Sequence, residues 1–174
     1  MLYTSTRDKS IKVESADAIA HGISEEGGLF IPVEIPKISK DDINELVGMD
    51  YIGRAKKILS LYLTDFSEDE IDYCVNGAYA KGKFSDEKIA PLHTLSDKAE
   101  ILELWKGPTC AFKDMALQCL PRFFSASAKL LTERGQLDHR FMILVATSGD
   151  TGKAALEGFR DVPGVSIGVM YPHG

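Results

Sequence analysis

Hydrophobic residues in the first part of the chain recur mainly at helical spacing, interrupted by two short extended runs. Residues 2–6 and 28–33 favour β-strands, and apolar positions three and four apart between them predict a short helix that ends at Gly22. From residue 41 to residue 80 the same spacing predicts further helices. A helix-rich amino-terminal region is therefore expected.

Two of these helices carry local start signals. Asp50 is a candidate N-cap, and Ser67 with Glu70 three residues later forms a capping-box pair. The buried face of the last helix is expected to consist of Ile71, Cys74, Val75 and Ala78.

Beyond residue 84 the pattern changes to strands that alternate with helices. The polar, turn-like stretch 81–88 is the best candidate for a boundary, so the expected domains are residues 1–84 and 85–174. The expected strands in the second domain are 91–95, 101–105, 141–145 and 165–171.

The last two of these strands flank a helical pattern, which predicts a βαβ unit and therefore a parallel sheet. The uninterrupted apolar run 141–145 is typical of a strand that is buried on both faces. Upstream, Pro121 falls inside a helical pattern, which predicts a kink or two abutting helices. The fold class indicated is α/β.

Composition excludes several classes of function. The 174 residues are 44% apolar and 26% charged, with a net charge of -6, which is typical of a globular protein able to bury a core. The acidic balance argues against a nucleic-acid surface or a polybasic membrane patch, and no apolar run is long enough to span a bilayer. Three cysteines without C-x-x-C spacing and four scattered histidines indicate neither a disulfide framework nor a metal site, so a cytoplasmic location is expected.

The first candidate for chemistry is Lys113. A short strand and a turn at Gly107 precede it, and a helix is expected to begin near Phe112, which places the lysine in the first turn. The helix dipole and burial among Trp105, Phe112 and Met115 would favour a neutral amine, which can attack a carbonyl. By position alone, a solvated surface lysine is the more common alternative.

The second candidate is the loop Thr147-Ser148-Gly149-Asp150-Thr151-Gly152, which leaves a parallel strand and enters a helix. Open α/β sheets bind ligands at this position, where free backbone N–H groups favour anions such as a carboxylate or a phosphate. The alternative is a plain helix cap made by Ser148 or Asp150. A P-loop is excluded, because its first glycine is replaced by Thr147 and alanine follows Lys153.

Together the two stretches resemble the threonine synthase family. Gly107-Pro-Thr-Cys-Ala-Phe-Lys113-Asp is followed about thirty residues later by Ala146-Thr-Ser-Gly-Asp-Thr-Gly152, and Gly27-Gly-Leu-Phe-Ile-Pro32 also resembles the start of that family. The resemblance implies a pyridoxal-phosphate enzyme of fold type II, similar to tryptophan synthase β. Here it implies a helix-rich amino-terminal region followed by an incomplete parallel-sheet, three-layer lobe.

The resemblance also implies roles for individual residues. Lys113 matches the lysine that binds pyridoxal 5'-phosphate as an imine and then acts as general acid and base. Thr147, Ser148, Gly149 and Thr151 match the element that holds the substrate carboxylate, while Asp150 is assigned to cofactor contact. The implied reaction converts O-phospho-L-homoserine and water to L-threonine and phosphate, that of a carbon–oxygen lyase acting on phosphates (EC 4.2.3.1).

Two departures from the family pattern bear on these roles. Lys106 stands where many relatives carry histidine, which leaves the local contacts of Lys113 open. The family's glycine-rich phosphate loop and its partner for the pyridine nitrogen come later than residue 174. We therefore expect an amino-terminal part of a longer enzyme, which alone binds the cofactor weakly or not at all and turns over no substrate. A related pyridoxal-phosphate-dependent phospholyase and a non-catalytic interaction or folding module are the alternatives, and the sequence assigns no oligomeric state.

Overall fold

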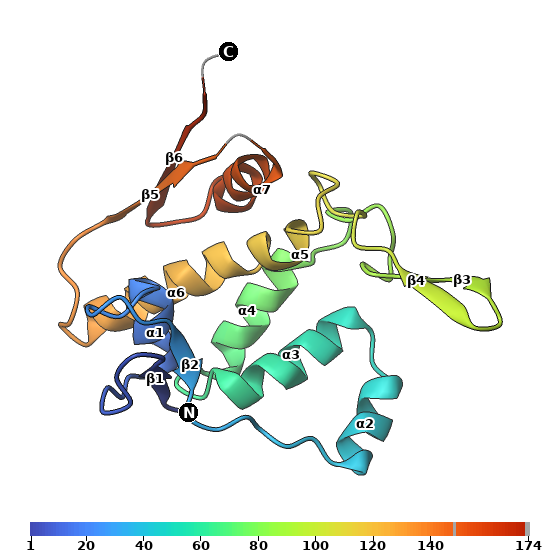
Figure 1. The fold of residues 1–174 in the computed structure, drawn as a ribbon, viewed down its shortest axis with the longest axis horizontal. Helices are drawn as coiled ribbons and strands as arrows, with labels where there is room; N and C mark the ends of the chain where they lie inside the picture. Colours follow the sequence, from blue (N-terminus) through green and yellow to red (C-terminus); the bar gives the residue numbers. More distant parts are fainter. Residues whose placement is uncertain (148, 173–174) are drawn as a thin grey trace. The chain divides into compact units, whose positions relative to one another are not determined.

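A computed structural model describes residues 1–147 and 149–172 of a mixed α/β chain (Figure 1). Its residues fall into two compact units. The first consists of residues 1–75 and 126–138, and the second of residues 76–125 with those from 139 onward. Each unit is described by itself, and the division expected at residue 84 stays a prediction.

The first unit combines a two-stranded sheet with helices, as the apolar spacing predicts. Strand β1 (Tyr3–Ser5) pairs antiparallel with β2 (Phe30–Pro32), with Tyr3 opposite Pro32. The helices of this unit are α1 (Ser15–His21), α2 (Lys40–Val47), α3 (Tyr51–Tyr62), most of α4 (Glu68–Ala78) and the later part of α6 (Leu120–Glu133).

The predicted start signals are confirmed. The Asp50 carboxylate accepts the Gly53 N–H at 2.7 Å, and Ser67 exchanges hydrogen bonds with Glu70 as a capping box requires. The expected inner face of α4 is also confirmed, since Ile71, Cys74, Val75 and Ala78 are all buried.

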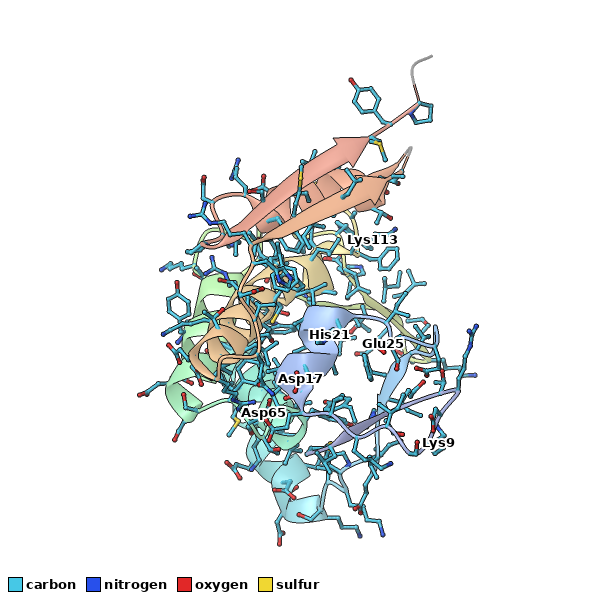
Figure 2. The ribbon with its side chains drawn as sticks, turned by 90° about the vertical axis from the view of Figure 1, so that its left-hand side faces the viewer. Lys9, Asp17, His21, Glu25, Asp65 and Lys113 are labelled. Carbon is cyan, nitrogen blue, oxygen red and sulfur yellow. The ribbon has the colours of Figure 1, made fainter. Side chains whose placement is uncertain are left out.

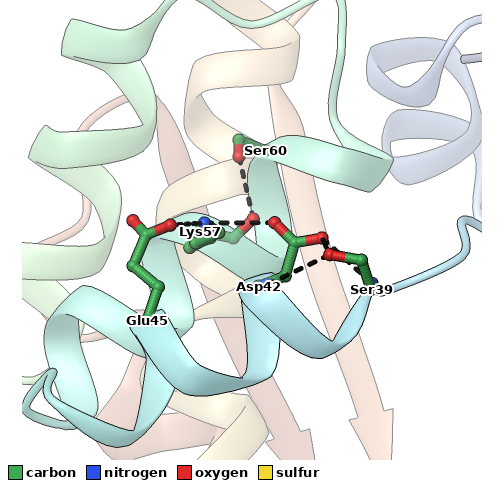
Figure 3. Close-up of polar contacts among 5 residues, drawn as sticks. All are labelled: Ser39, Asp42, Glu45, Lys57 and Ser60. Atoms are coloured by element: carbon green, nitrogen blue, oxygen red, sulfur yellow. Dashed lines mark hydrogen bonds and ion pairs between the residues drawn. The ribbon is translucent and has the colours of Figure 1, made fainter.

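Helix α2 buries none of its residues and is attached to α3 by polar contacts (Figure 3). Ser39 and Asp42 form a capping box at its start. The Lys57 ammonium on α3 contacts the carboxylates of Asp42, at 3.4 Å, and Glu45. Exposed ion pairs contribute little individually, so these contacts add little to the stability of α2.

Helix α1 is capped by a residue that lies far from it in the sequence. The Asp65 carboxylate accepts the backbone N–H of Ser15 at 3.2 Å and that of Ala16 at 2.9 Å. The preceding residue, Glu14, makes no side-chain cap. Because the cap comes from beyond α3, local sequence could not predict it.

The second unit contains the predicted βαβ element. Strand β5 (Phe141–Ala146) runs parallel to β6 (Val165–Met170), and α7 (Asp150–Phe159) connects them. The antiparallel hairpin β3 (Leu92–Ser96) and β4 (Ala99–Leu102) precedes it and is exposed throughout.

The expectation that the strand at 141–145 is buried on both faces is wrong for the described part of the chain. Burial alternates along β5, and the side chains of Met142 and Leu144 are 67% and 63% exposed. A strand is covered on both faces only where layers lie on both sides. Here α7 packs against one face of the strand only. Ala154 and Ala155 of this helix are buried.

The interruption predicted at Pro121 is confirmed as two abutting helices. Helix α5 (Asp114–Leu117) ends after one turn, and α6 begins with Pro121 in its own first turn. Close packing continues from there to α7, since a Cβ built on Gly158 would lie 1.8 Å from the Leu117 carbonyl oxygen. Across the residues that the structure describes, every helix is too short or too polar to cross a membrane.

Candidate functional site

Lys113 lies directly before α5, in the N-cap position (Figure 2). Its amine is 4.4 Å from the centroid of the Phe112 ring, a distance typical of a cation–π contact. The burial expected among aromatic residues is wrong, since Trp105 is 48% and Phe112 is 63% exposed. The side chain that the sequence selects is therefore partly exposed and available for reaction.

The loop before Lys113 is held by a buried carboxylate that sequence reasoning did not select. Asp114 is fully buried. It accepts the backbone N–H of Thr109 at 2.8 Å on Oδ2 and the Thr109 hydroxyl at 2.7 Å on Oδ1. These two hydrogen bonds, made at a fully buried position, hold the turn that carries Thr109 against the start of α5.

The Lys106 side chain, whose contacts the sequence leaves open, forms an ion pair within its own loop. Its amine pairs with Glu103 at 2.9 Å. The hydrogen bond to Glu103 raises the pKa of Lys106 above its ordinary value. The lysine is therefore charged and paired, and the open question of its contacts is answered within its own loop.

The described residues of the second predicted loop include one bond within the helix start, from the Gly152 N–H to the Gly149 carbonyl at 3.2 Å. Thr147 donates its N–H to the Met170 carbonyl at 3.0 Å, and Gly149 donates weakly to the Thr147 hydroxyl at 3.4 Å. Gly149 is the N-cap of α7, while Asp150 and Thr151 begin the helix and are exposed. A cap made by Asp150 is thus wrong, and Ser148 lies outside the described residues.

A cavity of about 740 Å³ in the second unit brings the two stretches together. Pro108 and Thr109 line it from the first stretch, and Thr147 and Gly149 line it from the second. The rest of the lining comes from α7, β6 and the residue after β6: Gly152, Lys153, Leu156, Glu157, Arg160, Ile167, Val169 and Tyr171. Among the described residues, this lining does not include the predicted site residues Lys113, Asp150 and Thr151.

One direct contact connects the stretches. The Lys153 ammonium on α7 donates to the Thr109 carbonyl at 3.1 Å. Neither Thr109 nor Lys153 was singled out for a role from the sequence. A threonine five residues before an aspartate in a helix's first turn was the local signal for the Asp114 contact, whereas the Lys153 contact joins residues 44 positions apart.

Comparisons with known proteins agree on one family. Residues 2–79 match the family model described as threonine synthase N terminus. The threonine synthase of Pseudomonas aeruginosa is 35% identical over 99% of this chain, which covers 35% of that protein. The chain therefore spans about a third of the length of such relatives.

Solved structures give the same result. The pyridoxal-phosphate-bound threonine synthase from Brucella melitensis superposes with a TM-score of 0.90 at 34% identity, with 100% of this chain and 36% of that chain covered. Yeast threonine synthase gives 0.87 at 31% identity, over 99% of this chain and 36% of its own. Over its whole length this chain is thus similar to the amino-terminal portion of threonine synthases.

Proposed function

We propose that these residues form the lysine-bearing part of a pyridoxal-phosphate-dependent threonine synthase. The observation that carries this proposal is the joining of two stretches in one unit. Lys113 follows a loop that Asp114 holds, and that loop lines the same cavity as Thr147 and Gly149. The similarity to a pyridoxal-phosphate-bound relative supports the same assignment.

The donors present suit this cofactor and an amino-acid substrate. Lys113 offers a partly exposed primary amine, and the start of α7 offers backbone N–H groups beside a cavity large enough for a small ligand. Pyridoxal phosphate, when bound, supplies an electron sink that stabilises carbanions. The protein's own task is to hold and orient the reacting groups.

We assign the following tasks to its residues. Lys113 binds the cofactor and, once released, moves a proton at the substrate carbons. Thr147, Ser148, Gly149 and Thr151 bind the substrate carboxylate, and Asp150 contacts the cofactor. The reaction proposed for the whole protein takes O-phospho-L-homoserine and water to L-threonine and phosphate. Three free cysteines support a reducing, cytoplasmic location.

Reductive trapping tests the role of Lys113. The chain is incubated with excess pyridoxal phosphate, reduced with borohydride and digested, and the labelled lysines are identified by mass spectrometry. We expect the main adduct at Lys113, and its loss in Lys113→Ala. The matched control is Lys98→Ala in the exposed β3–β4 hairpin, which should leave the Lys113 adduct unchanged. Labelling spread evenly over the lysines would contradict the assignment.

A hybrid enzyme tests the reaction. Residues 1–174 replace the matching part of the Pseudomonas aeruginosa relative, and the purified hybrid is supplied with O-phospho-L-homoserine. We expect equal amounts of phosphate and threonine, and neither product with Lys113→Ala. Phosphate release without threonine would favour a related phospholyase. A folded hybrid that binds the cofactor but releases no phosphate would favour a non-catalytic module.

A further inference from the structure

We propose that Thr109 is a positioning residue, the joint through which Asp114 and Lys153 fix Lys113 relative to the loop at residues 147–152. This inference rests on the proposed function, because it concerns how Lys113 is presented to the cofactor. It adds three residues to which neither the motifs nor the comparisons assign a role.

All the polar groups of Thr109 are engaged. Its N–H and its hydroxyl donate to the two carboxylate oxygens of Asp114, at 2.8 Å and 2.7 Å. Its carbonyl accepts from the Lys153 ammonium at 3.1 Å. Thr109 is itself buried, with 6% of its surface exposed, so losing any one of these partners would leave a desolvated polar group unpaired.

The Asp114 side of the joint lies one peptide bond from Lys113. Because Asp114 is fully buried and pairs through both oxygens, its backbone has little freedom, and neither has the peptide that joins it to Lys113. The turn itself is also tightly packed. A Cβ on Gly107 would lie 2.4 Å from the Asp114 Cβ, and Cys110 already takes a positive φ of 60°.

The Lys153 side of the joint comes from the other stretch. Lys153 lies in the first turn of α7, directly after the loop that lines the cavity. Its contact is made to a neutral carbonyl, while Glu157 one turn later pairs with Arg160 at 2.7 Å. The hydrogen bond of Lys153 therefore connects the start of α7 to the turn that Asp114 stabilises. A displacement of one stretch is thereby coupled to a displacement of the other.

The experiment compares isosteric variants by the same reductive trapping, with the Lys113 adduct divided by the adduct at Lys9 in the same molecule. Lys9 is exposed and serves as an internal reference. Thr109→Val removes the hydroxyl donor and keeps the shape, and should lower the ratio about tenfold. Thr109→Ser keeps the hydroxyl and should retain the wild-type ratio. Lys153→Met should lower the ratio about threefold.

Matched controls separate positioning from loss of stability. Thr94→Val and Lys98→Met make the same chemical changes in the exposed hairpin and should leave the ratio unchanged. All variants are trapped well below their unfolding midpoints, recorded on the same samples. A role confined to stability would lower the midpoint of Thr109→Val without lowering the ratio, and that result would overturn the inference.

The outcomes also separate this inference from the proposed function. If the wild-type chain is labelled selectively at Lys113, and the Thr109→Val and Lys153→Met variants are labelled just as selectively, the positioning role of Thr109 is refuted. The role of Lys113 would then remain intact. A wild-type Lys113 adduct no larger than the adducts at exposed lysines such as Lys9 and Lys98 would refute the role of Lys113 and the inference with it. Selective labelling of Lys113 that is lost in Thr109→Val and kept in Thr109→Ser supports both the role of Lys113 and the positioning role of Thr109.

Discussion

The two loops of the candidate site are built in opposite ways. The turn before Lys113 is fastened by a fully buried carboxylate, by a lysine from α7 and by close backbone packing at Gly107. The loop that leads into α7 has an extended glycine as its N-cap and exposed residues at its helix start, and a Cβ on Gly149 would meet nothing within 4 Å.

This difference matches the proposed roles of the two loops. A residue that bonds covalently to a cofactor gains from being fixed before the reaction, because its ordering cost is then met by folding. A loop that binds an anion through its N–H groups must be able to exchange weak internal bonds, such as the 3.4 Å bond of Gly149, for bonds to the ligand. Folding thus orders the first loop, and binding is expected to order the second.

The largest effect is expected from Asp114→Ala. It removes the acceptor of two hydrogen bonds at a fully buried position and leaves the Thr109 donors unpaired. We expect the free energy of unfolding to fall by about 3 kcal/mol, measured by urea denaturation. The control is Asp69→Ala in the exposed first turn of α4, where the loss should stay below about 0.5 kcal/mol. Equal losses would show that the turn is not fastened by Asp114.

The second-largest effect on stability is expected at Cys119, the second residue after α5. Burial raises the pKa of the Cys119 thiol to about 11. Between about pH 9 and pH 11 the unfolded chain therefore loses this proton while the folded chain keeps it, so stability falls as the pH rises. Relative to Cys119→Ala, the wild type should lose a further 2 to 3 kcal/mol or so across this window in urea denaturation. If the stabilities of the wild type and of Cys119→Ala change in parallel with pH, the Cys119 thiol is accessible to water in the folded chain.

Alanine in place of one glycine in each loop tests the comparison directly. Gly107→Ala places a Cβ 2.4 Å from the Asp114 Cβ, so the backbone must shift, and we expect a loss of about 2 kcal/mol. Gly149→Ala meets no atom within 4 Å at an extended φ of -145°, and should change stability by less than about 0.5 kcal/mol. If the two losses are alike, the loops do not differ in packing.

The smallest effect is expected from Thr147→Val. Among the described residues, the Thr147 hydroxyl accepts the weak 3.4 Å bond from Gly149, so its removal should cost less than about 0.5 kcal/mol in the same assay. A loss above about 1 kcal/mol would mean that the loop is already fastened without ligand.

Local features of the fold could be predicted from the sequence. The Asp50 cap, the capping box at Ser67 and the break at Pro121 all depend on residues within a few positions of each other, and the structure confirms them. The parallel β5–β6 pair was also predictable, because a strand, helix and strand at that spacing allow few topologies.

Features that depend on distant contacts could not be predicted. The apolar run in β5 is the same whether one face or two are covered, so the exposure of Met142 and Leu144 has no local signal. The motif around Lys113 selected the reactive amine but not its support. The spacing of Thr109 and Asp114 is a local signal for their contact, but the full burial of Asp114 and the contact from Lys153 are seen only in the folded chain.

Amide hydrogen exchange, followed residue by residue by NMR, tests most directly the claim that one loop is ordered by folding and the other by ligand. We predict that the Thr109 amide, which donates to a buried carboxylate, exchanges at least about 100-fold more slowly than the amides of Gly149 and Thr151. Added O-phospho-L-homoserine, whose carboxylate this loop is proposed to bind, should slow only the latter two. Rapid exchange at Thr109, or protection of Gly149 and Thr151 before any ligand is added, would contradict the account.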